Sequence, residues 1–257
     1  MGAARSGRCV QGGDLTGPDS EHDTPNGGPW RNFYGRRHGK TLRQGQKNLL
    51  ENRLAELAPT GVNWAENPER DPIDPKAPFP EARGVWLEIG FGAGEHMLNM
   101  AAANPHIGII GCEAYVNGVA MLLAGIERAG VANLAIHPGD ARDLMDVLPA
   151  GSIEQVFLLY PDPWPKTRHH KRRFINAENL DQLARIMAPG SMLRIATDIG
   201  DYARHVLEMI NPDPRFAWLA LGPADWRESW AGWPGTRYES KALREGRPPH
   251  YLSFRRL

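Results

Sequence analysis

The segment that decides the fold is residues 85–94, Val85-Trp86-Leu87-Glu88-Ile89-Gly90-Phe91-Gly92-Ala93-Gly94. Its first half is apolar except for one glutamate, which is typical of a strand covered on both faces of a sheet. Its second half carries three alternate glycines, which allow backbone to approach a ligand and a helix to contact a strand closely. Helical spacing follows over residues 95–103 and ends at Asn104-Pro105. The segment therefore predicts a strand, a tight turn and a helix.

The same alternation of strands and helices continues along the chain. Further strands are predicted at residues 107–112, 134–137, 155–160 and 191–197, and further helices at residues 116–129, 177–187 and 199–210. Strands separated by helices pair in parallel through right-handed crossovers. Residues 251–254 alternate in polarity and are predicted to form an edge strand. The predicted fold class is α/β, a mostly parallel doubly wound sheet with an antiparallel edge strand.

The residues before this region have a different composition. Residues 1–29 hold seven glycines and three prolines with almost no large apolar residue, which predicts a disordered tail. Residues 42–57 show helical spacing of leucines, and Pro59 ends that helix. Residues 59–80 hold six prolines and predict an extended connector. We therefore divide the chain into a tail (1–29), a basic helix with its connector (30–83) and one α/β domain (84–257).

Composition limits the class of protein. The chain has 257 residues, of which 41% are hydrophobic and 23% are charged, as in soluble globular proteins. It has no apolar run of about 18 residues and no apolar secretory segment, so we expect a cytoplasmic protein without a membrane partner. Two cysteines are too few for a disulfide framework or a four-thiolate zinc site. No metal site is predicted, because the adjacent His169 and His170 point apart and have no evident carboxylate partner.

The formal net charge is zero, but its distribution is uneven. Residues 30–53, 166–173 and 237–257 together carry 18 basic and 3 acidic side chains, whereas the rest of the chain carries 12 basic and 27 acidic ones. The balance alone would argue against a nucleic-acid partner. The distribution makes the three basic segments candidates for phosphate contact if they meet in space, although solvated surface charge explains any one of them equally well.

The glycine turn indicates the kind of ligand. Its spacing is Gly-x-Gly-x-Gly rather than the Gly-x-Gly-x-x-Gly of dinucleotide folds. Glu88 and Glu95 flank it and would repel a pyrophosphate, so a cationic ligand without phosphate, such as S-adenosylmethionine, fits better. Glu113 can accept hydrogen bonds from ribose hydroxyls, and Asp140 can accept one from an adenine amino group. These residues follow the ends of neighbouring strands, which predicts that they line one crevice. For the glycine turn considered alone, a purely structural role stays open as an alternative.

The fourth predicted strand leads into Tyr160-Pro161-Asp162-Pro163-Trp164-Pro165-Lys166. Two prolines bracket Asp162 and fix the backbone there, which would hold its carboxylate at the crevice. The basic run that continues to Arg173 is interpreted as a phosphate contact. Asp198, after the fifth strand, and residues 236–239 are ordinary turn or surface positions when taken alone.

Together these motifs resemble the bacterial tRNA (guanine-N7)-methyltransferases, from about residue 33 to residue 254. The resemblance is carried by residues 88–96, by the Asp-Pro-Trp-Pro-Lys block with residues 168–173, and by Thr236-Arg237-Tyr238-Glu239. It implies a Rossmann-like class I methyltransferase fold with S-adenosylmethionine as cofactor. The implied cofactor-binding residues are Glu88, Gly90, Gly92, Gly94, Glu113, Asp140 and Asp162, of which Asp162 is also catalytic. The implied substrate-binding residues are Lys166, Asp198, Thr236, Arg237, Tyr238 and Glu239, and the implied RNA-contacting residues are Arg168, His169, His170, Lys171, Arg172 and Arg173.

The implied reaction transfers a methyl group to N7 of a guanosine in the variable loop of tRNA, giving 7-methylguanosine and S-adenosylhomocysteine. N7 carries a lone pair and no proton, so no general base is needed, and a fixed carboxylate would stabilise the cation that develops in the ring. We expect tRNA as the partner, and a monomer or homodimer without an obligatory protein partner. Three alternatives stay open: a class I RNA methyltransferase acting on a base amino group, a nicotinamide-dependent oxidoreductase, and a non-catalytic RNA-binding module.

Overall fold

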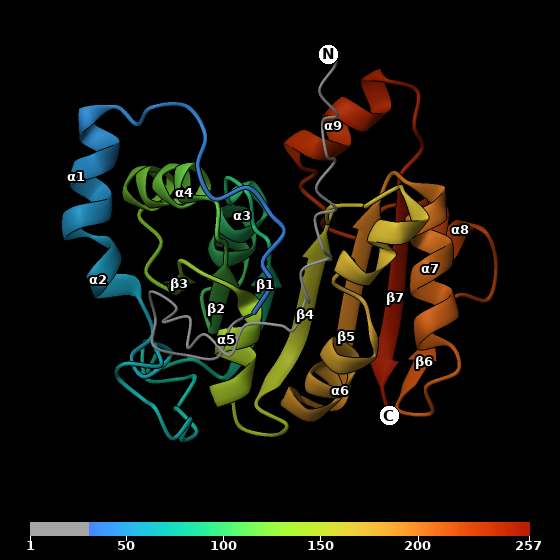
Figure 1. The fold of residues 1–257 in the computed structure, drawn as a ribbon, viewed down its shortest axis with the longest axis horizontal. Helices are drawn as coiled ribbons and strands as arrows, with labels where there is room; N and C mark the ends of the chain where they lie inside the picture. Colours follow the sequence, from blue (N-terminus) through green and yellow to red (C-terminus); the bar gives the residue numbers. More distant parts are fainter. Residues whose placement is uncertain (1–30) are drawn as a thin grey trace, which may run out of the picture.

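A seven-stranded sheet with the strand order β3-β2-β1-β4-β5-β7-β6 organises the structure (Figure 1). The structure is a computed structural model that describes residues 31–257, so the predicted disordered tail lies outside the described residues. The strands are β1 (Gly84–Ile89), β2 (Ile107–Cys112), β3 (Leu134–His137), β4 (Ile153–Leu159), β5 (Met187–Thr197), β6 (Phe216–Trp218) and β7 (His250–Arg256). Strands β1 to β5 pair in parallel, and β7 is antiparallel to both of its neighbours.

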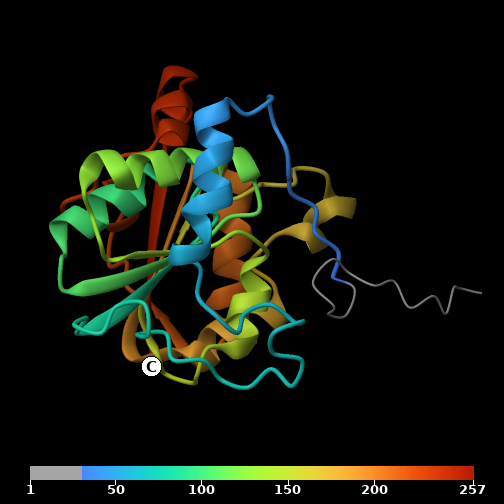
Figure 2. The ribbon, with the colours of Figure 1, turned by 90° about the vertical axis from the view of Figure 1, so that its left-hand side faces the viewer.

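Helices cover both faces of this sheet (Figures 1 and 2). One face carries α3 (Glu95–Ala103) and α4 (Val116–Ala129), and the other carries α5 (Ala141–Val147), α6 (Ala177–Ile186) and α7 (Gly200–Ile210). Helix α1 (Gln44–Asn52) packs outside α4, and α2 (Leu54–Leu57) follows it. The remaining helices are η1 (Thr167–Arg172), α8 (Ala224–Arg227) and α9 (Arg237–Arg244). Coverage on both faces explains why the strands read as continuous apolar runs.

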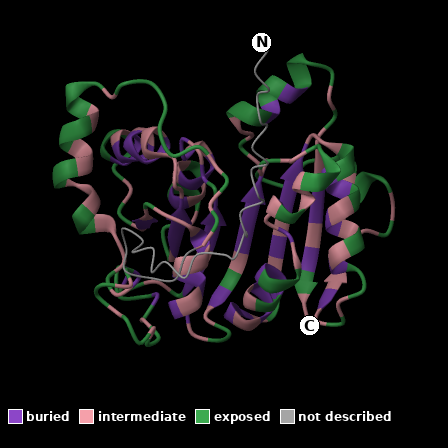
Figure 3. Ribbon diagram, viewed as in Figure 1, coloured by how far each residue is buried: buried purple, intermediate pink, exposed green. Residues whose placement is uncertain are grey.

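Buried side chains concentrate in the strands and on the sheet-facing sides of the helices (Figure 3). Helix α1 has no fully buried residue, and its Leu49 and Leu50 pack only against the edge of the cluster beneath α4. The proline-rich connector contributes Val62 and Phe79 to the core. A Cβ at Gly108 in β2 would lie 2.1 Å from the Phe79 ring, so the connector is packed tightly against the sheet.

The sequence predicts most of the central elements closely, and the differences have local causes. Strand β5 begins at Met187 rather than at residue 191, with a register shift against β4. The sheet has an antiparallel edge, but the edge position predicted for residues 251–254 is wrong, because the short β6 pairs on the outer side of β7. Helices α5 and α9 are not predicted; each begins directly after a predicted binding residue, Asp140 and Thr236 respectively, whose side chain caps the helix.

The strand order reverses at β1, which pairs with β2 on one side and with β4 on the other. At such a switch point the chains that leave the two halves of the sheet turn apart, and a crevice forms beyond the carboxyl ends of the strands. The fold thereby brings together the glycine turn after β1, Glu113 after β2, Asp140 after β3 and Asp162 after β4.

Gly118 in α4 packs directly on the glycine turn, because a Cβ there would lie 2.1 Å from the carbonyl oxygen of Gly92. A backbone atom cannot move away freely, so we expect Gly118→Ala to lower the free energy of unfolding by about 1–3 kcal/mol. Gly45→Ala in α1 is the matched control, since nothing lies within 4 Å of its Cβ position. That variant should be neutral or more stable by up to about 1 kcal/mol. Thermal and denaturant unfolding measure both, and equal stability of the two variants would contradict this packing.

Candidate active site

A cavity of about 720 Å³ opens at the carboxyl ends of the parallel strands. Its volume lies in the range of pockets that bind cofactor-sized ligands. Its walls come from the glycine turn, residues 32–36, 112–115, 139–142, 158–162 and 171–174, and the side chains of Trp164, Arg237 and Tyr238. The cavity therefore unites five predicted cofactor residues: Gly90, Gly92, Glu113, Asp140 and Asp162.

The glycine turn requires glycine for two different reasons. Gly90, Gly92 and Gly94 have φ values of 73°, 60° and 79°, in the left-handed region that other residues seldom adopt. No atom lies within 4 Å of a Cβ built at Gly90, which faces the open cavity. A Cβ at Gly94 would lie 2.5 Å from Leu122, so Gly94 allows α4 to approach. Gly94 thus faces α4 rather than the cavity and contributes to the packing of the turn.

Glu113 joins the glycine turn to the end of β2. Its Oε2 accepts the N–H of Gly92 at 2.8 Å, and its Oε1 accepts the N–H of Tyr115 at 2.8 Å. Burial raises the pKa of the Glu113 carboxyl, and the backbone donors limit the rise. Each carboxylate oxygen keeps a further lone pair, so Glu113 can bind hydroxyl groups of a ligand while it holds the turn.

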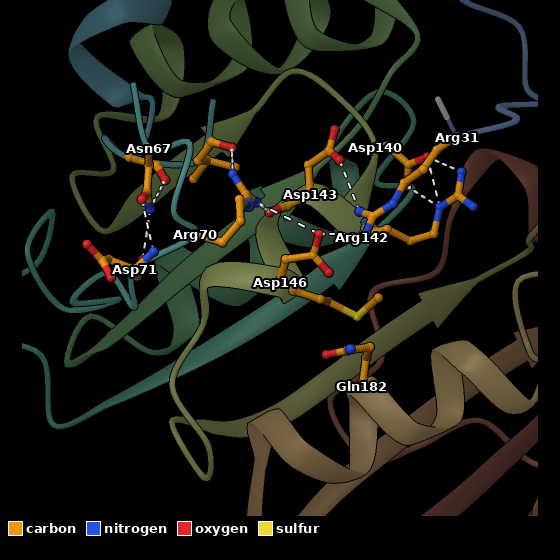
Figure 4. Close-up of polar contacts among 12 residues, drawn as sticks. Arg31, Asn67, Arg70, Asp71, Asp140, Arg142, Asp143, Asp146 and Gln182 are labelled. Carbon is orange, nitrogen blue, oxygen red and sulfur yellow. Dashed lines mark hydrogen bonds and ion pairs between the residues drawn. The ribbon is translucent and has the colours of Figure 1, made fainter. Parts of the chain in front are cut away.

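The Asp140 carboxylate already has hydrogen-bond partners within the protein (Figure 4). It caps α5 by accepting the N–H of Arg142 at 3.0 Å, and the Nε of Arg142 donates to its Oδ2 at 3.0 Å. Burial opposes ionisation of Asp140, but the bonds from Arg142 outweigh it and hold the pKa below its ordinary value. Arg142 also donates to the carbonyl oxygen of Asn32 at 3.0 Å. The adenine contact of Asp140 stays a prediction.

Glu88 is turned toward α3 rather than toward the cavity. It is 2% exposed, and its Oε2 lies 2.6 Å from Nδ1 of His96. The His96 ring in turn contacts the rings of Phe157 and Trp233. Glu88 therefore ties β1 to α3, and its predicted cofactor contact stays a prediction that this side-chain position does not support.

Asp162 lies in the cavity wall between two residues with unusual backbone. Tyr160 and Trp164 have φ values of 50° and 43°, a left-handed conformation that costs free energy for these residue types and concentrates at functional sites. The carboxylate is open to the cavity, yet the surrounding walls reduce its hydration and raise its pKa, against the effect of Arg36 nearby. An ionisable group with this environment is a strong candidate for a catalytic residue.

The basic run after Asp162 forms the 3₁₀-helix η1, whose period of three residues sorts its side chains onto three sides. Within η1 the period places Arg168 on the same side as Lys171 and His169 on the same side as Arg172. Arg173, directly after the helix, follows on the side of His170. The first pair is exposed and suited to phosphate contact.

The second pair lies against aromatic rings at the rim of the cavity. His169 meets the Trp164 ring edge to face at 6.0 Å. The Arg172 guanidinium lies 5.0 Å from the Trp164 ring and 4.5 Å from the Tyr34 ring. Aromatic rings and a guanidinium at the rim of a cavity also suit contact with nucleobases.

The third pair faces inward, toward Asp201 at the start of α7. His170 Nε2 lies 3.8 Å from the Asp201 carboxylate, and Arg173 forms an ion pair with it. Arg173 is 1% exposed and donates its Nε to the carbonyl oxygen of Pro163 at 2.9 Å. Arg173 therefore has its partners within the protein, and its RNA contact stays a prediction that this buried position does not support.

The predicted substrate residues divide between the cavity and the interior. Arg237 and Tyr238 line the cavity, and the Nε of Arg237 donates to Oε1 of Glu95 in α3 at 2.6 Å. Thr236 and Glu239 form a capping box that begins α9, with the Glu239 N–H 3.1 Å from the Thr236 Oγ1. The contact between Arg237 and Glu95 links α9 to α3 beside the cavity, and the capping box gives Thr236 a structural role.

The carboxylates of Glu239 and Asp198 also have protein partners. Glu239 accepts the indole N–H of Trp233 at 2.6 Å and the hydroxyl of Tyr251. Asp198 accepts from the Nε of Arg247 at 2.6 Å. Lys166 is exposed and lies outside the cavity lining. Substrate contact by Lys166, Asp198, Thr236 and Glu239 stays a prediction.

Residues 31–37 form a strap along the cavity that the sequence analysis does not predict. Arg31 is paired with Asp143 at 3.1 Å and with Asp146 at 2.6 Å, both in α5 (Figure 4). Further along the strap, the Tyr34 ring meets the Trp164 ring at 6.1 Å, and the carbonyl oxygen of Arg37 accepts from the amide at the start of α4 at 3.0 Å. In the sequence, the feature that could have indicated this strap is the pair of aromatic residues among the cations at positions 31–37.

Parts of all three basic segments meet at this cavity. Arg36, Lys171, Arg172 and Arg237 line it. Arg255 and Arg256 do not join them, because β7 runs antiparallel and carries the C-terminus to the other end of the sheet (Figure 1). The three basic segments therefore meet at the cavity through the strap, η1 and α9.

Other classes of site find little support in residues 31–257. Within this range no group of three or more histidine, cysteine, aspartate or glutamate side chains is placed to hold a metal ion. Burial raises the pKa of the Cys112 thiol well above its ordinary value, which makes it a packing group rather than a nucleophile. The helices of this range are all too short or too polar to cross a membrane.

The strand order, the switch-point cavity and the glycine turn define a class I methyltransferase fold. The aminoglycoside resistance methyltransferase NpmB1 shares it with a TM-score of 0.50 and 17% identity, covering 71% of this chain and 91% of that one. The 16S rRNA methyltransferase KamB shares it with a TM-score of 0.50 and 15% identity, covering 70% of this chain and 91% of that one. The predicted fold class is confirmed.

A family model described as "Putative methyltransferase" matches residues 82–252. The tRNA (guanine-N(7)-)-methyltransferase of Ruegeria sp. (strain TM1040) is 58% identical over 240 residues, 93% of each chain. The enzyme of that name from Roseobacter denitrificans (strain ATCC 33942 / OCh 114) is 62% identical over 226 residues, 88% of this chain and 96% of the relative. The chain belongs to the tRNA (guanine-N(7)-)-methyltransferase family, as the resemblance predicts.

Replacing Glu113 by glutamine tests its link to the glycine turn. Glutamine has one acceptor oxygen, so one of the two backbone N–H groups now bound would face an amide nitrogen, at a cost of about 1–3 kcal/mol. We expect Glu113→Gln to weaken S-adenosylhomocysteine binding by about tenfold or more, as measured by calorimetric titration. Glu127→Gln, at an exposed position of α4, should bind like the unaltered protein. Unchanged affinity in Glu113→Gln would contradict the assigned role.

Proposed function

We propose that this chain transfers the methyl group of S-adenosylmethionine to N7 of a guanosine in tRNA, giving 7-methylguanosine and S-adenosylhomocysteine. The observation that carries the proposal is the position of Asp162, a carboxylate on constrained backbone that shares one cavity with Glu113 and is surrounded by a rim of cations. The family relatives bear the name of this activity.

The residues of the cavity fit S-adenosylmethionine. The turn is open at Gly90, where any side chain would intrude, and the acids Glu113 and Asp162 suit a cationic ligand that carries hydroxyl groups. We assign the ribose hydroxyls to Glu113 and the adenine amino group to Asp140, with Glu88 and Gly94 as supports of the turn. When bound, the cofactor supplies an electrophilic methyl group on a sulfonium; the protein supplies orientation and electrostatics.

Asp162 has two functions in this proposal. Guanine N7 has a free lone pair, so the protein needs to orient the base rather than remove a proton. The carboxylate can accept hydrogen bonds from N1–H and the amino group of guanine, a donor pair that adenine lacks. The same negative charge, in a cavity that limits hydration, would stabilise the positive charge that develops in the purine ring. The flanking prolines fix the group before substrate binds, which reduces the entropic cost of orientation.

The exposed cations around the cavity would hold the tRNA backbone. Arg168 and Lys171 of η1, Arg36 of the strap and Lys241 of α9 are exposed at this end of the sheet. Such contacts give affinity and position without reading sequence. The family resemblance implies a target guanosine in the variable loop. A position outside continuous helix is consistent with this, because N7 in an A-form helix lies in a deep, narrow groove. We further propose that the reaction takes place in the cytoplasm and needs no obligatory protein partner, since one chain supplies the cavity walls.

Asp162→Asn keeps the size of the side chain and removes its charge. We expect single-turnover methyl transfer to unmodified tRNA to fall by about 100-fold or more, with the unfolding temperature unchanged. Digestion of the product and mass analysis of the nucleoside identify the methylated position and separate N7 from a base amino group. Asp71→Asn is the matched control, because Asp71 is exposed on the connector and should give the unaltered rate.

The pH dependence follows from the same carboxylate. The cavity raises the pKa of Asp162, so protonation removes its charge at a higher pH than for an ordinary aspartate. The rate at saturating substrates should therefore fall as the pH drops through this raised pKa, and Asp162→Asn should lack that limb of the profile. Near-normal rates in Asp162→Asn, or an unchanged acid limb, would exclude Asp162 as the catalytic carboxylate.

The double variant Arg168→Ala with Lys171→Ala removes the two exposed cations of η1. We expect weaker tRNA binding and a slope of log affinity against log salt that is smaller by about 1.5, with S-adenosylhomocysteine binding unchanged. Arg83→Ala with Arg255→Ala removes the same charge at the opposite end of the sheet and should leave tRNA binding nearly unchanged. Salt titrations of tRNA binding compare the two, and equal weakening would show that net charge alone matters.

A further inference from the structure

Arg173 ends the basic run, yet it is one of the largest fully buried side chains of the described residues. A buried guanidinium is costly unless its donors are paired. Its Nε donates to the carbonyl oxygen of Pro163 at 2.9 Å. One terminal nitrogen donates to the Asp201 carboxylate and, at 3.5 Å, to the carbonyl oxygen of Trp164. Its charge and most of its hydrogen-bonding capacity are therefore used inside the protein.

The two carbonyl groups that Arg173 binds belong to the residues directly after Asp162. Trp164 has the left-handed φ of 43°, and Tyr160, two residues before Asp162, has a φ of 50°. Residues with side chains keep such a conformation only where the surrounding structure holds it. The proline on each side leaves the segment few other conformations. The position of the bound carbonyl groups therefore sets the position of the Asp162 carboxylate.

The other side of this contact is α7, a helix packed against the core. Asp201 lies in the first turn of α7, whose Tyr202 and Val206 are fully buried in the core. The Arg173 guanidinium also lies 5.5 Å from the Tyr202 ring. The hydrogen bond from Arg173 lowers the pKa of Asp201, which favours the charged form of this carboxylate. The Asp162 loop is thus tied to α7 through one arginine.

We propose that Arg173 is a positioning residue for methyl transfer, which fixes the Asp162 carboxylate in the cavity by clasping the Pro163 and Trp164 carbonyl groups against Asp201. The planar guanidinium suits this task because it donates in several fixed directions, whereas lysine offers a single point charge. The reaction that the clasp serves rests on the proposed function; the clasp itself rests on contacts within the chain.

The first test measures single-turnover methyl transfer by the full chain at saturating tRNA and cofactor. Arg173→Ala and Arg173→Lys should each lose about 100-fold in rate, since displacing a positioned group by about 1 Å costs this much. The dissociation constants for tRNA and S-adenosylhomocysteine should stay within about threefold. Arg204→Ala is the matched control, because Arg204 is 72% exposed and lies 4.0 Å from the same Asp201. Weaker tRNA binding with an unchanged rate at saturation would overturn the proposal in favour of an RNA contact.

Chemical rescue by added guanidinium tests the positioning role directly, because the rate would not recover if Arg173 served only to stabilise the fold. Arg173→Ala leaves a space shaped for a guanidinium ion, so low millimolar guanidinium should raise its rate by about tenfold or more, which ammonium should not do. Asp162→Asn should show no rescue. Failure of rescue in a folded Arg173→Ala variant would overturn the proposal. If that variant does not fold, Asp201→Asn removes the half-exposed anchor without opening a cavity and should show the same loss of rate.

Hydrogen exchange separates this inference from the proposed function. The amides of Asp162 and Trp164 should exchange faster in Arg173→Ala and Asp201→Asn than in the unaltered chain, while those of β5 should not change. This result does not depend on which nucleoside is methylated. An unaltered chain without activity on tRNA would refute the proposed function, whereas unchanged exchange around Asp162 would refute the clasp.

Discussion

The close contact between the glycine turn and α4 is the constraint on which the rest of the site depends. The carbonyl oxygen of Gly92 occupies the space that a Cβ at Gly118 would need, and the Glu113 carboxylate binds the N–H of the same Gly92. The turn is thereby held against the ends of β1 and β2, and its left-handed backbone follows from that position. Because the turn cannot relax inward, the space between Gly90 and the loop after β4 stays open as a preformed cavity.

The electrostatics of the cavity follow from this arrangement. Reduced hydration raises the pKa of Glu113 and of Asp162, because it disfavours their charged forms. A cation that enters the cavity would stabilise the charged form of both carboxylates. Asp140 differs, because Arg142 already balances its charge. The strap, η1 and α9 place cations around the rim. The net charge of zero is therefore the sum of acidic groups inside the cavity and basic groups around its rim. The acidic groups suit a cationic cofactor, and the basic groups suit a polyanionic substrate.

The parallel sheet can be predicted from the sequence because each buried strand is a continuous apolar run with a clear end. Residues at those ends then fall into one crevice, and Glu113 and Asp162, predicted on that basis, line the cavity. The unpredicted parts depend on contacts between distant segments. Arg31 brings the strap to the cavity by pairing with Asp143, 112 residues further along the chain. Strand β6, with three residues, is too short to carry a pattern.

The basic run shows why residue type does not assign a role to a charged side chain. Arg172 and Arg173 are chemically identical neighbours, yet the first lies against aromatic rings at the rim and the second is buried against Asp201. The 3₁₀ period decides this, because each step along the run turns the side chain by about a third of a turn. A one-residue insertion in the run would move a different side chain to the buried position. The position of each side chain along the run therefore decides its role. The partner of the buried position is Asp201, which lies 28 residues beyond Arg173 and cannot be inferred from the run itself.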